Sequence, residues 1–384
     1  MSLGTDRLAP LPPRMAALHR FIVDKALPLW AQGGVHPRAG VFVEHLHLDG
    51  RPDLDAARRM RVQARQIYVY AHATQLGLTD QRALVLRAFE RMAADYWQPE
   101  GGFILSVNAT GRPHDRTQTA YDQAFGLFAT AWLYRLTRDV AFLEWSRRIL
   151  QFMDAKLGDV GHGGYADSVG AATRCQNPHM HLLEALLALF EASGDPAFLA
   201  RADEIWGLFR THFLDRSIPG LREFFTPDWR PDPATGDQLD PGHHLEWVWL
   251  LHRYRQHRPK AADETGLLFD FAMRHGMAPD GLVLDEVDAA GSVLRATKRL
   301  WPQTEHIKAR VVRLDTGQES GLGEIDRICG LLLDHYLDAA VGTWNDQVGA
   351  SGERLSRMAP ASSFYHLFLA YAEAMRVAGV GGPG

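Results

Sequence analysis

The chain has 384 residues, of which 46% are hydrophobic, and it carries a formal net charge of −5. A chain of this length can bury a large core, either as one large domain or as two of ordinary size. The mild acidity argues against a nucleic-acid-binding surface, which would require clustered positive charge.

Cysteine content and hydropathy bear on the cellular compartment. Cys175 and Cys329 are the only cysteines, which excludes a metal site built from several thiolates and indicates a reducing compartment. No apolar run reaches the roughly 18 residues that a membrane-spanning helix requires. The first residues, MSLGTDRLAPLPPR, lack the apolar core of a signal peptide. We therefore expect a soluble cytoplasmic protein without a membrane partner.

Helical patterns follow one another along the whole chain. Apolar spacing and capping residues predict twelve helices, over residues 14–31, 55–76, 80–97, 118–136, 139–156, 177–194, 196–213, 241–256, 260–276, 300–313, 321–338 and 361–377. One set is amphipathic, as in AFLARADEIWGLFRTHF, and the other is apolar nearly all round, as in HLLEALLALFEA. A helix that is apolar on every side is buried, so the second set is expected to form an inner ring and the first an outer ring.

A glycine followed by a short β-like stretch recurs in the chain. The copies begin at Gly40, Gly102, Gly164, Gly220, Gly281 and Gly342, at spacings of 62, 62, 56, 61 and 61 residues. Six copies and twelve helices predict an all-α fold, an (α/α)6 barrel of six helical hairpins. We expect one domain over residues 1–384, with 1–13 and 379–384 as flexible ends. An open superhelix of hairpins is the alternative, but such solenoids usually need polar capping repeats, which the sequence lacks.

Polar residues gather at the start of the apolar helices. Asp240 and Pro241 predict a helix start in DPGHHLEW, which places His243 and Glu246 on one face and His244 elsewhere. Residues at one phase of a closed ring converge at one mouth, so a single polar pocket is expected there. The first polar residues of the six helices share such a phase: Arg65, Tyr121, Asn177, His243, Gln303 and His366.

The residue types in this pocket favour a sugar as the ligand. Hydrogen-bonding groups on all sides suit a polyhydroxylated molecule, and Trp247, Trp301 and Trp344 are candidate stacking faces. Histidine is the side chain type that ordinarily titrates near neutral pH, so a pocket built around His243 and His366 favours proton transfer next to a carbonyl group.

Two other chemistries fit less well. A glycoside hydrolase would require two carboxylates flanking the bond, and only Glu246 and Glu305 could serve. A metal site made from His181, His243, His366 and Glu246 lacks a compact ligand motif within one helix, apart from HMH at 179–181. We therefore expect neither a metal nor a cofactor.

At these residues the sequence resembles the N-acylglucosamine 2-epimerase superfamily, which includes mannose isomerases and cellobiose 2-epimerases. The likeness runs from QARQ through YDQAF, NPHMHLLEA, PGHHLEW and LWPQTE to FYH. It implies an (α/α)6 barrel in which His243 and His366 are the acid and base histidines and Glu246 supports His243. It also implies that an open-chain sugar is held by Arg65, Tyr121, Asn177, His181, Trp301 and Gln303.

The same resemblance implies that a proton leaves C2 of the sugar to give a cis-enediolate. Return of the proton to C1 gives a ketose, and return to C2 from the opposite face gives the epimer. The isomerase branch looks closer, because RLWPQTE holds a single tryptophan and the loops are short. We expect an aldose–ketose isomerase acting on a mannose- or fructose-like sugar, with a 2-epimerase of N-acylglucosamine or cellobiose type as the alternative.

Three points stay open. Lys298 and Arg299 lie near the expected mouth and leave a phosphorylated sugar possible. Mammalian relatives have been described as binding partners of another protein, but the intact histidines argue against a non-catalytic role. The oligomeric state is also open, with a homodimer as one state to be considered.

Overall fold

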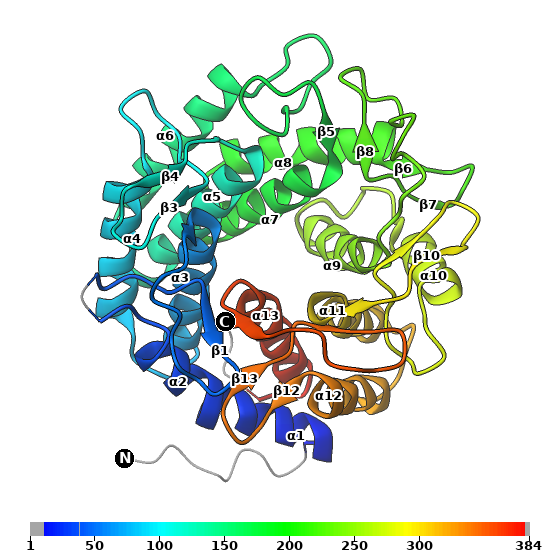
Figure 1. Ribbon diagram of the computed structural model, residues 1–384. Coiled ribbons are helices and arrows are strands. Elements are labelled where there is room, and N and C mark those ends of the chain that lie inside the picture. Colours follow the sequence, from blue (N-terminus) through cyan, green and yellow to red (C-terminus); the bar gives the residue numbers. More distant parts are fainter. Residues whose placement is uncertain (1–10, 38, 381–384) are drawn as a thin grey trace.

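The computed structural model describes residues 11–37 and 39–380 and shows two concentric rings of helices (Figure 1). Each inner helix packs against the next, and the last packs against the first, so the ring closes. The predicted (α/α)6 barrel is therefore confirmed, and the open superhelix is wrong. The inner helices are α3 (Met60–Gln75), α5 (Ala120–Thr137), α7 (Gln176–Ser193), α9 (Pro241–His257), α11 (Leu300–Asp315) and α13 (Ser363–Val377).

The outer ring begins with one long helical run that changes its winding. It comprises α1 (Pro13–Arg20), a π-helical turn (Phe21–Ala26) and α2 (Leu27–Gln32). A second π-helical turn, Phe209–Phe213, directly follows the outer helix α8 (Pro196–Leu208). The other helices of the outer ring are α4 (Arg82–Tyr96), α6 (Ala141–Lys156), α8 (Pro196–Leu208), α10 (Thr265–His275) and α12 (Gly323–His335).

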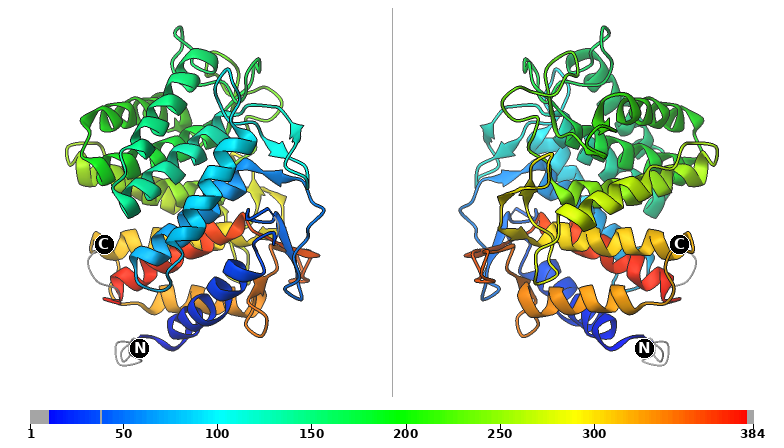
Figure 2. Two further views of the ribbon diagram at one scale, coloured as in Figure 1. Left: turned by 90° about the vertical axis from the view of Figure 1, so that its left-hand side faces the viewer. Right: turned by 90° about the vertical axis from the view of Figure 1, so that its right-hand side faces the viewer.

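Short antiparallel strands gather at one end of the barrel (Figure 2). The backbone ahead of each inner helix pairs with the glycine-turn segment of the following repeat, which links the repeats around the ring. The paired strands are β2 (Arg58–Arg59) with β3 (Ser106–Val107), β5 (Arg174–Cys175) with β8 (Phe224–Phe225), β11 (Lys298–Arg299) with β14 (Gln347–Val348), and β15 (Met358–Pro360) with β1 (His45–His47). Isolated bridges join Thr119 to Ser168 and Leu239 to Val287 in the two remaining places.

The other strands are local hairpins at the same end. They are β4 (Pro113–Asp115), β6 (Leu214–Asp215), β7 (Gly220–Leu221), β9 (Glu286–Val287), β10 (Val293–Arg295), β12 (Leu337–Asp338) and β13 (Thr343–Trp344). The predicted β-like stretches thus form short strands between the helices.

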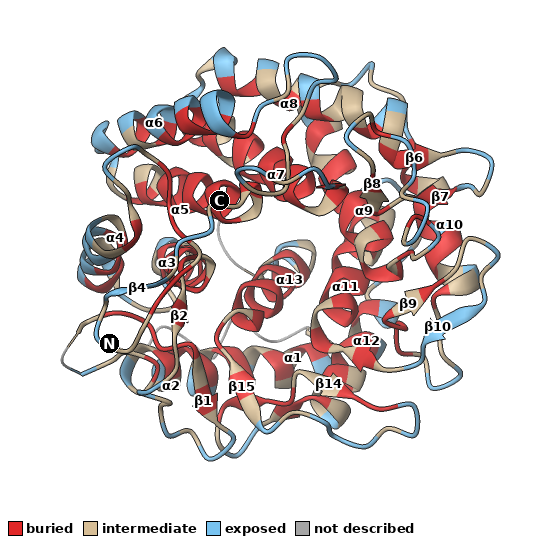
Figure 3. Cartoon of the chain, turned by 45° about the horizontal axis from the view of Figure 1, so that its top comes forward, coloured by how far each residue is buried: buried red, intermediate tan, exposed pale blue. Residues whose placement is uncertain are grey.

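Burial follows the two rings (Figure 3). Inner helices are buried nearly all round, whereas outer helices expose one face, as the two classes of sequence pattern predicted. No helix of the described ranges is long and apolar enough to cross a membrane. Cys175 and Cys329 are both free thiols, so no disulfide joins them.

The described residues include parts of both predicted end segments. Residues 1–10 and 381–384 lie outside the described residues. Leu11 and Val380 pack against the core, and α1 already begins at Pro13, a residue suited to the first turn of a helix. Apolar side chains thus anchor the chain at both of these points, and the flexibility expected for 1–13 and 379–384 stays a prediction.

A buried side chain on five of the inner helices holds the glycine-turn segment in place. Glutamine does so through both ends of its amide: Gln63 Oε1 accepts from the N–H of Phe42 at 2.9 Å, and its Nε2 donates to the same residue's carbonyl at 2.8 Å. The histidines accept one N–H at Nε2, as His244 does from Leu221 at 2.8 Å. We call these five the clamp residues: Gln63, Gln123, His179, His244 and Gln303.

At Gly164 the clamp residue helps to explain why the turn requires a glycine. A Cβ on Gly164 would lie 2.9 Å from Nε2 of the clamp residue His179. The same glycine has a φ of 70°, which an L side chain rarely adopts. Since a clamp side chain points away from the barrel axis, the helix positions two before and two after it point toward the axis.

Candidate active site

The candidate site lies on these inward positions, at the strand end of the inner ring. Two residues before the clamp, the side chains are half-buried; we call Arg61, Tyr121, Asn177 and Trp301 the rim residues. Two residues after the clamp, the polar side chains are buried; these are Arg65, His181, Glu246 and Glu305, and with His366 of α13 we call them the floor residues. Solvent exposure therefore falls from the rim to the floor.

His243 is held by a carboxylate from a loop. Its Nδ1 lies 2.9 Å from Oε2 of Glu223, and the same oxygen accepts a hydrogen bond from Gln176. Burial by itself lowers the pKa of His243, but the charges of Glu223 and Asp240 outweigh burial and raise the pKa to about 9. His243 is therefore protonated at neutral pH.

His366 is held by a carboxylate from α11. Its Nδ1 lies 2.9 Å from Oε1 of Glu305, whose other oxygen lies 2.6 Å from Nζ of Lys308. Burial lowers the pKa of His366 well below its usual value, and the positive charges of Arg65 and Lys308 lower it further. His366 is therefore neutral at neutral pH and can accept a proton.

The indole of Trp301 lies beside both histidines. Its ring centroid is 5.0 Å from that of His243 and 5.5 Å from that of His366. Two imidazoles of opposite protonation state thus flank one aromatic face. Groups whose environments push their pKa values apart in this way are suited to act as an acid and a base on one substrate.

The floor residue Arg65 packs against aromatic rings. Its guanidinium carbon is 4.3 Å from the ring centroid of Phe125 and 5.0 Å from that of Tyr365. One terminal nitrogen donates to the Tyr121 hydroxyl at 2.6 Å and the other to the Ser362 carbonyl at 3.2 Å. Arg65 thus has no carboxylate hydrogen-bonded to it among the described residues.

Two further predicted residues lie in the same cluster. His181 is buried, with its Nδ1 3.2 Å from Oε2 of Glu184 and its ring 6.5 Å from that of His366. Glu184 also accepts a hydrogen bond from the Tyr365 hydroxyl at 2.6 Å. The side-chain oxygen of Asn177 is buried and has no hydrogen-bond partner in the described part of the chain.

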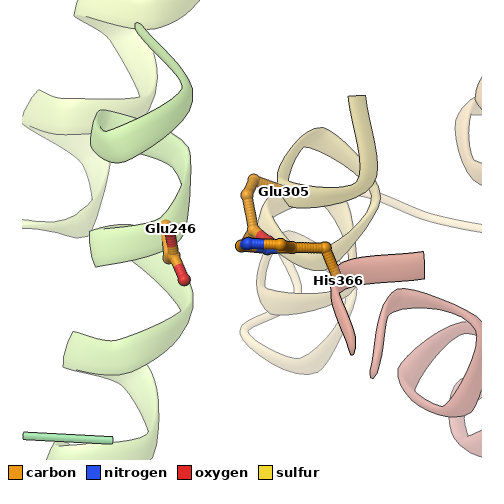
Figure 4. A group of neighbouring side chains, drawn as sticks. All are labelled: Glu246, Glu305 and His366. Carbon is orange, nitrogen blue, oxygen red and sulfur yellow. The ribbon is translucent and has the colours of Figure 1, made fainter. Parts of the chain in front are cut away.

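Glu246 faces the His366–Glu305 pair from α9 (Figure 4). Its side chain is 1% exposed, and neither carboxylate oxygen has a hydrogen-bond partner within the described ranges. A buried polar group without a partner is costly, so these oxygens are suited to accept hydroxyl groups of a ligand.

Three of these side chains could in principle hold a metal ion. One ligand atom from each of Glu246, Glu305 and His366 lies within 4.8 Å of the others. The ammonium of Lys308, however, already lies 2.6 Å from Glu305 and opposes a second cation there. We therefore assign no metal to this group.

Several sequence-based assignments need correction. Glu246 is not the hydrogen-bond partner of His243, because Glu223 occupies its Nδ1, and the charge of Glu246 makes only a smaller contribution to the pKa of His243. Gln303 is a clamp residue whose amide bonds the backbone of Val283 and Arg299, so it offers no free group to a sugar. It lies on the opposite face of α11 from Trp301 and Glu305, which sit two positions to either side.

Two predicted stacking faces and two predicted basic residues also have structural roles. Trp247 and Trp344 are fully buried in the core. Lys298 pairs with Asp280 at 2.6 Å, and Arg299 pairs with Asp240 at 2.8 Å and with Asp285 at 3.0 Å. Neither cation is therefore available to a phosphate group without breaking an existing ion pair.

Glu223, Glu184 and Lys308 were not predicted as site residues. Glu223 follows its repeat glycine by three residues, as Asp167 does, but Asp167 accepts the N–H of Cys175 ahead of an inner helix. The repeat could thus have located a carboxylate in this turn. It could not have shown that Glu223 points to His243, because that direction depends on tertiary packing.

Comparisons with known proteins point to one family. The sequence profile of the N-acylglucosamine 2-epimerase family matches residues 40–370. A mannose-6-phosphate isomerase from Rhizobium meliloti is 36% identical over 370 residues, covering 92% of this chain and 94% of that protein. A cellobiose 2-epimerase from Bacteroides fragilis is 22% identical over 319 residues, covering 76% and 79%.

The fold has a counterpart among solved structures. The crystal structure of a D-mannose isomerase superposes with a TM-score of 0.85 at 19% identity, covering 96% of this chain and all of that one. At this identity the likeness concerns the fold alone. Since the family profile spans most of the barrel, including both histidine-bearing helices, the chain belongs to the N-acylglucosamine 2-epimerase family of enzymes.

Proposed function

We propose that the protein is an aldose–ketose isomerase that interconverts a mannose-like aldose and its ketose through a cis-enediolate. The single observation that carries this proposal is the contrast between His243, whose pKa is raised to about 9, and His366, whose pKa is lowered. Transfer of a proton between C2 and C1 requires a base for one carbon and an acid for the neighbouring oxygen.

The two histidines take these roles in the proposed reaction. Protonated His243 gives its proton to the ring oxygen as the ring opens and recovers a proton from the C1 hydroxyl group. Neutral His366 then removes the C2 proton, while His243 donates a hydrogen bond to the carbonyl oxygen as negative charge develops there. Arg65 adds a fixed positive charge beside the enediolate. His366 then returns the proton to C1, while the proton on O2 is transferred to O1 through His243, which yields the ketose.

The other residues of the cluster are proposed to hold the open-chain sugar. Glu246 and Asn177 offer unpartnered buried oxygens to hydroxyl groups. Tyr121 and Trp301 contribute half-buried aromatic faces at the rim, and His181 adds a ring nitrogen near His366. Gln303 is not included, because its amide is used by the backbone.

The charges favour a free sugar over a phosphorylated one. Four carboxylates lie in or around the site: Glu184, Glu223, Glu246 and Glu305. The basic side chains near the mouth are already paired with acids. Arg61 pairs with Asp122, and Arg299 pairs with Asp240. A dianionic phosphate would meet this negative charge with no unpaired cation among the rim residues defined above. We therefore propose an uncharged aldose, although one relative is named for a sugar phosphate.

Epimerisation remains the second candidate, because it shares the enediolate and differs only in where the proton returns. A glycoside hydrolase is disfavoured, since one oxygen of Glu305 is bonded to His366 and the other is paired with Lys308. Glu305 is thus not free to act with Glu246 as the second carboxylate across a glycosidic bond.

The test is incubation of the purified chain with mannose, fructose, glucose, N-acetylmannosamine, cellobiose and mannose 6-phosphate, followed by chromatography of the products. Interconversion of mannose and fructose is the expected result. A C2 epimer as the main product would replace the isomerase with the epimerase, and selective turnover of the phosphate would overturn the argument from charge. Absence of turnover on every sugar would favour a non-catalytic protein.

The unpaired thiols are consistent with the proposal of a cytoplasmic protein. Cell fractionation tests this location. Light scattering of the purified chain distinguishes a monomer from a homodimer.

A further inference from the structure

Lys308 is a fully buried lysine that contacts Glu305, the carboxylate partner of the proposed base His366. We call Glu305 and His366 the base assembly. The reaction described above does not use Lys308. Its side chain is 0% exposed, and its Nζ lies 2.6 Å from Oε2 of Glu305 and 4.4 Å from the ring centroid of Trp249. Burying an ammonium group is expensive unless its charge is compensated. The contact with Oε2 of Glu305 therefore provides compensation for the buried ammonium charge.

Lys308, Glu305 and His366 form a series of contacts that ends at the proposed base. The ammonium contacts Oε2 of Glu305, and Oε1 lies 2.9 Å from Nδ1 of His366. If Glu305 is ionised, it can only accept, so the imidazole proton sits on Nδ1 and Nε2 keeps its lone pair. If Glu305 is protonated, its O–H donates to Nδ1, the imidazole proton moves to Nε2, and the base is lost.

We propose that Lys308 is a positioning residue that keeps Glu305 ionised and thereby holds the proton of His366 on Nδ1. The proposal rests on the function proposed above, since it assigns the tautomer of the proposed base. Lys308 itself does not touch the substrate. Its charge acts directly on the pKa of His366, but its proposed effect on the tautomer passes through Glu305.

The electrostatics of the floor show why a lysine is needed. Burial, followed by the nearby carboxylates of Glu246 and Glu184, raises the pKa of Glu305 well above its usual value even with Lys308 in place, and the ammonium 2.6 Å from Oε2 is the group that opposes this rise. The pKa of Lys308 is raised in turn, because the three carboxylates outweigh its burial. Without the ammonium, the balance at Glu305 shifts toward the neutral acid.

Charged and titratable groups from every neighbouring inner helix face this series of contacts. The groups whose charge acts on Glu305, Lys308 or His366 are Arg65 on α3, His181 and Glu184 on α7, and His243 and Glu246 on α9. Tyr365 on α13 faces the same carboxylates. On the far side of α11, Arg327 of α12 acts on His306, and Asp326 of α12 bonds the backbone of Arg14. Of the cations that face Glu305 and His366 within the described ranges, namely Arg65, protonated His243 and Lys308, only Lys308 contacts Glu305.

The test uses Lys308→Met in the full chain, which keeps the length of the side chain and removes its charge. At pH 7 we expect kcat to fall by about 10²- to 10⁴-fold, the range for loss of a general base, with KM changed little. The acid limb of the kcat/KM profile should move to higher pH, because Glu305 must now ionise unaided. In the ring ¹⁵N NMR spectrum, the proton of His366 should move from Nδ1 to Nε2.

The matched control is Lys298→Met. Lys298 is 2% exposed and pairs with Asp280 at 2.6 Å, so this variant also loses a buried ion pair, but outside the base assembly. It should lose stability and keep the pH profile and the His366 tautomer of the unchanged chain. An altered tautomer in Lys298→Met would mean that any buried charge loss disturbs the site and would overturn the assignment.

A double variant covers the case in which Lys308→Met does not fold. Glu305→Gln with Lys308→Met leaves neither charge unpaired and should have the His366 tautomer of Glu305→Gln alone and a kcat within about tenfold of it, because the effect of Lys308 on the tautomer passes through Glu305. A further tenfold loss in the double variant would overturn the proposal, as would a wild-type tautomer in Lys308→Met. Since NMR reports the tautomer without turnover, these outcomes are independent of whether the proposed isomerase activity is correct.

Discussion

His243 and Glu223 form a 2.9 Å contact that joins the start of α9 to a loop twenty residues earlier in the chain. This contact gives His243 a proton at neutral pH, whereas the contact between His366 and Glu305 belongs to an imidazole whose pKa is lowered. Both histidines thus have a carboxylate partner, and the surrounding charges set opposite protonation states.

Glu223→Gln should narrow the pH range of activity. With Glu223 in place, protonated His243 is lost only as the pH rises through its pKa of about 9. Removing the carboxylate leaves burial to dominate, so the pKa of His243 should fall and the alkaline limb of kcat/KM should move to lower pH, by about one pH unit or more. A pH–rate profile of both proteins measures this. An unmoved alkaline limb would assign that limb to another group.

The same pKa makes a prediction about stability. His243 has a folded-state pKa raised above 6.5, so its contribution to stability is complete below pH 6.5 and is lost as the pH rises through about 9. A tenfold difference in proton affinity between the folded and unfolded chain corresponds to roughly 1.4 kcal/mol. The difference in unfolding free energy between the unchanged chain and Glu223→Gln should therefore shrink as the pH rises from 6.5 through about 9 in urea denaturation. A difference independent of pH would show that Glu223 does not act through His243.

Adjacent histidines of α9 should give opposite results when substituted. His243→Ala should lower kcat by about 10²-fold or more with the fold intact, because an acid is lost. His244→Ala should chiefly lower the unfolding free energy, by about 1–3 kcal/mol, because the N–H of Leu221 loses its acceptor.

His244→Gln provides the matched control for this pair. Glutamine takes the clamp position in three other repeats, at Gln63, Gln123 and Gln303, so it should recover part of the stability that alanine loses. Thermal denaturation and initial rates on the three variants separate the two roles. Comparable rate losses in His243→Ala and His244→Ala would contradict the separation.

Sequence patterns predicted the helices well wherever local signals define their ends. Helix α9 was expected over 241–256 and is Pro241–His257, because Asp240 caps its start by accepting from the N–H of Gly242. Helix α3 was expected from residue 55 but begins at Met60. Residues 58–59 instead pair with β3, more than forty residues away, and no local pattern could reveal that pairing.

The site was predicted less completely, because its phase was assigned from the first polar residue of each helix. That rule merged two opposite helix faces. Gln303 belongs to the clamp face, whereas Trp301 and Glu305 belong to the face that points to the axis. The partner of His243 lay in a turn segment that the helix patterns did not cover, so Glu246 was chosen in place of Glu223.

The reassignment of Gln303 is itself testable. Gln303→Ala removes the acceptor for the N–H of Val283 and should lower the unfolding free energy by about 1–3 kcal/mol. KM should change less than twofold, because the amide offers no group to the sugar. A tenfold rise in KM at unchanged stability would return Gln303 to the binding site.

The route of the substrate hydrogen distinguishes the proposed chemistry from a metal-assisted hydride shift. A proton held on His366 can exchange with solvent before it returns to carbon, so fructose formed from mannose in D₂O should carry deuterium at C1. A hydride shift would carry the hydrogen directly from C2 to C1 without exchange. Because Lys308 opposes a cation at the Glu246–Glu305–His366 group, activity should also survive exhaustive chelation. NMR of the product and assays after chelation measure both effects. Chelator-sensitive activity without deuterium incorporation would mean that this barrel performs a different reaction, whereas label at C2 of an aldose product would identify the epimerase.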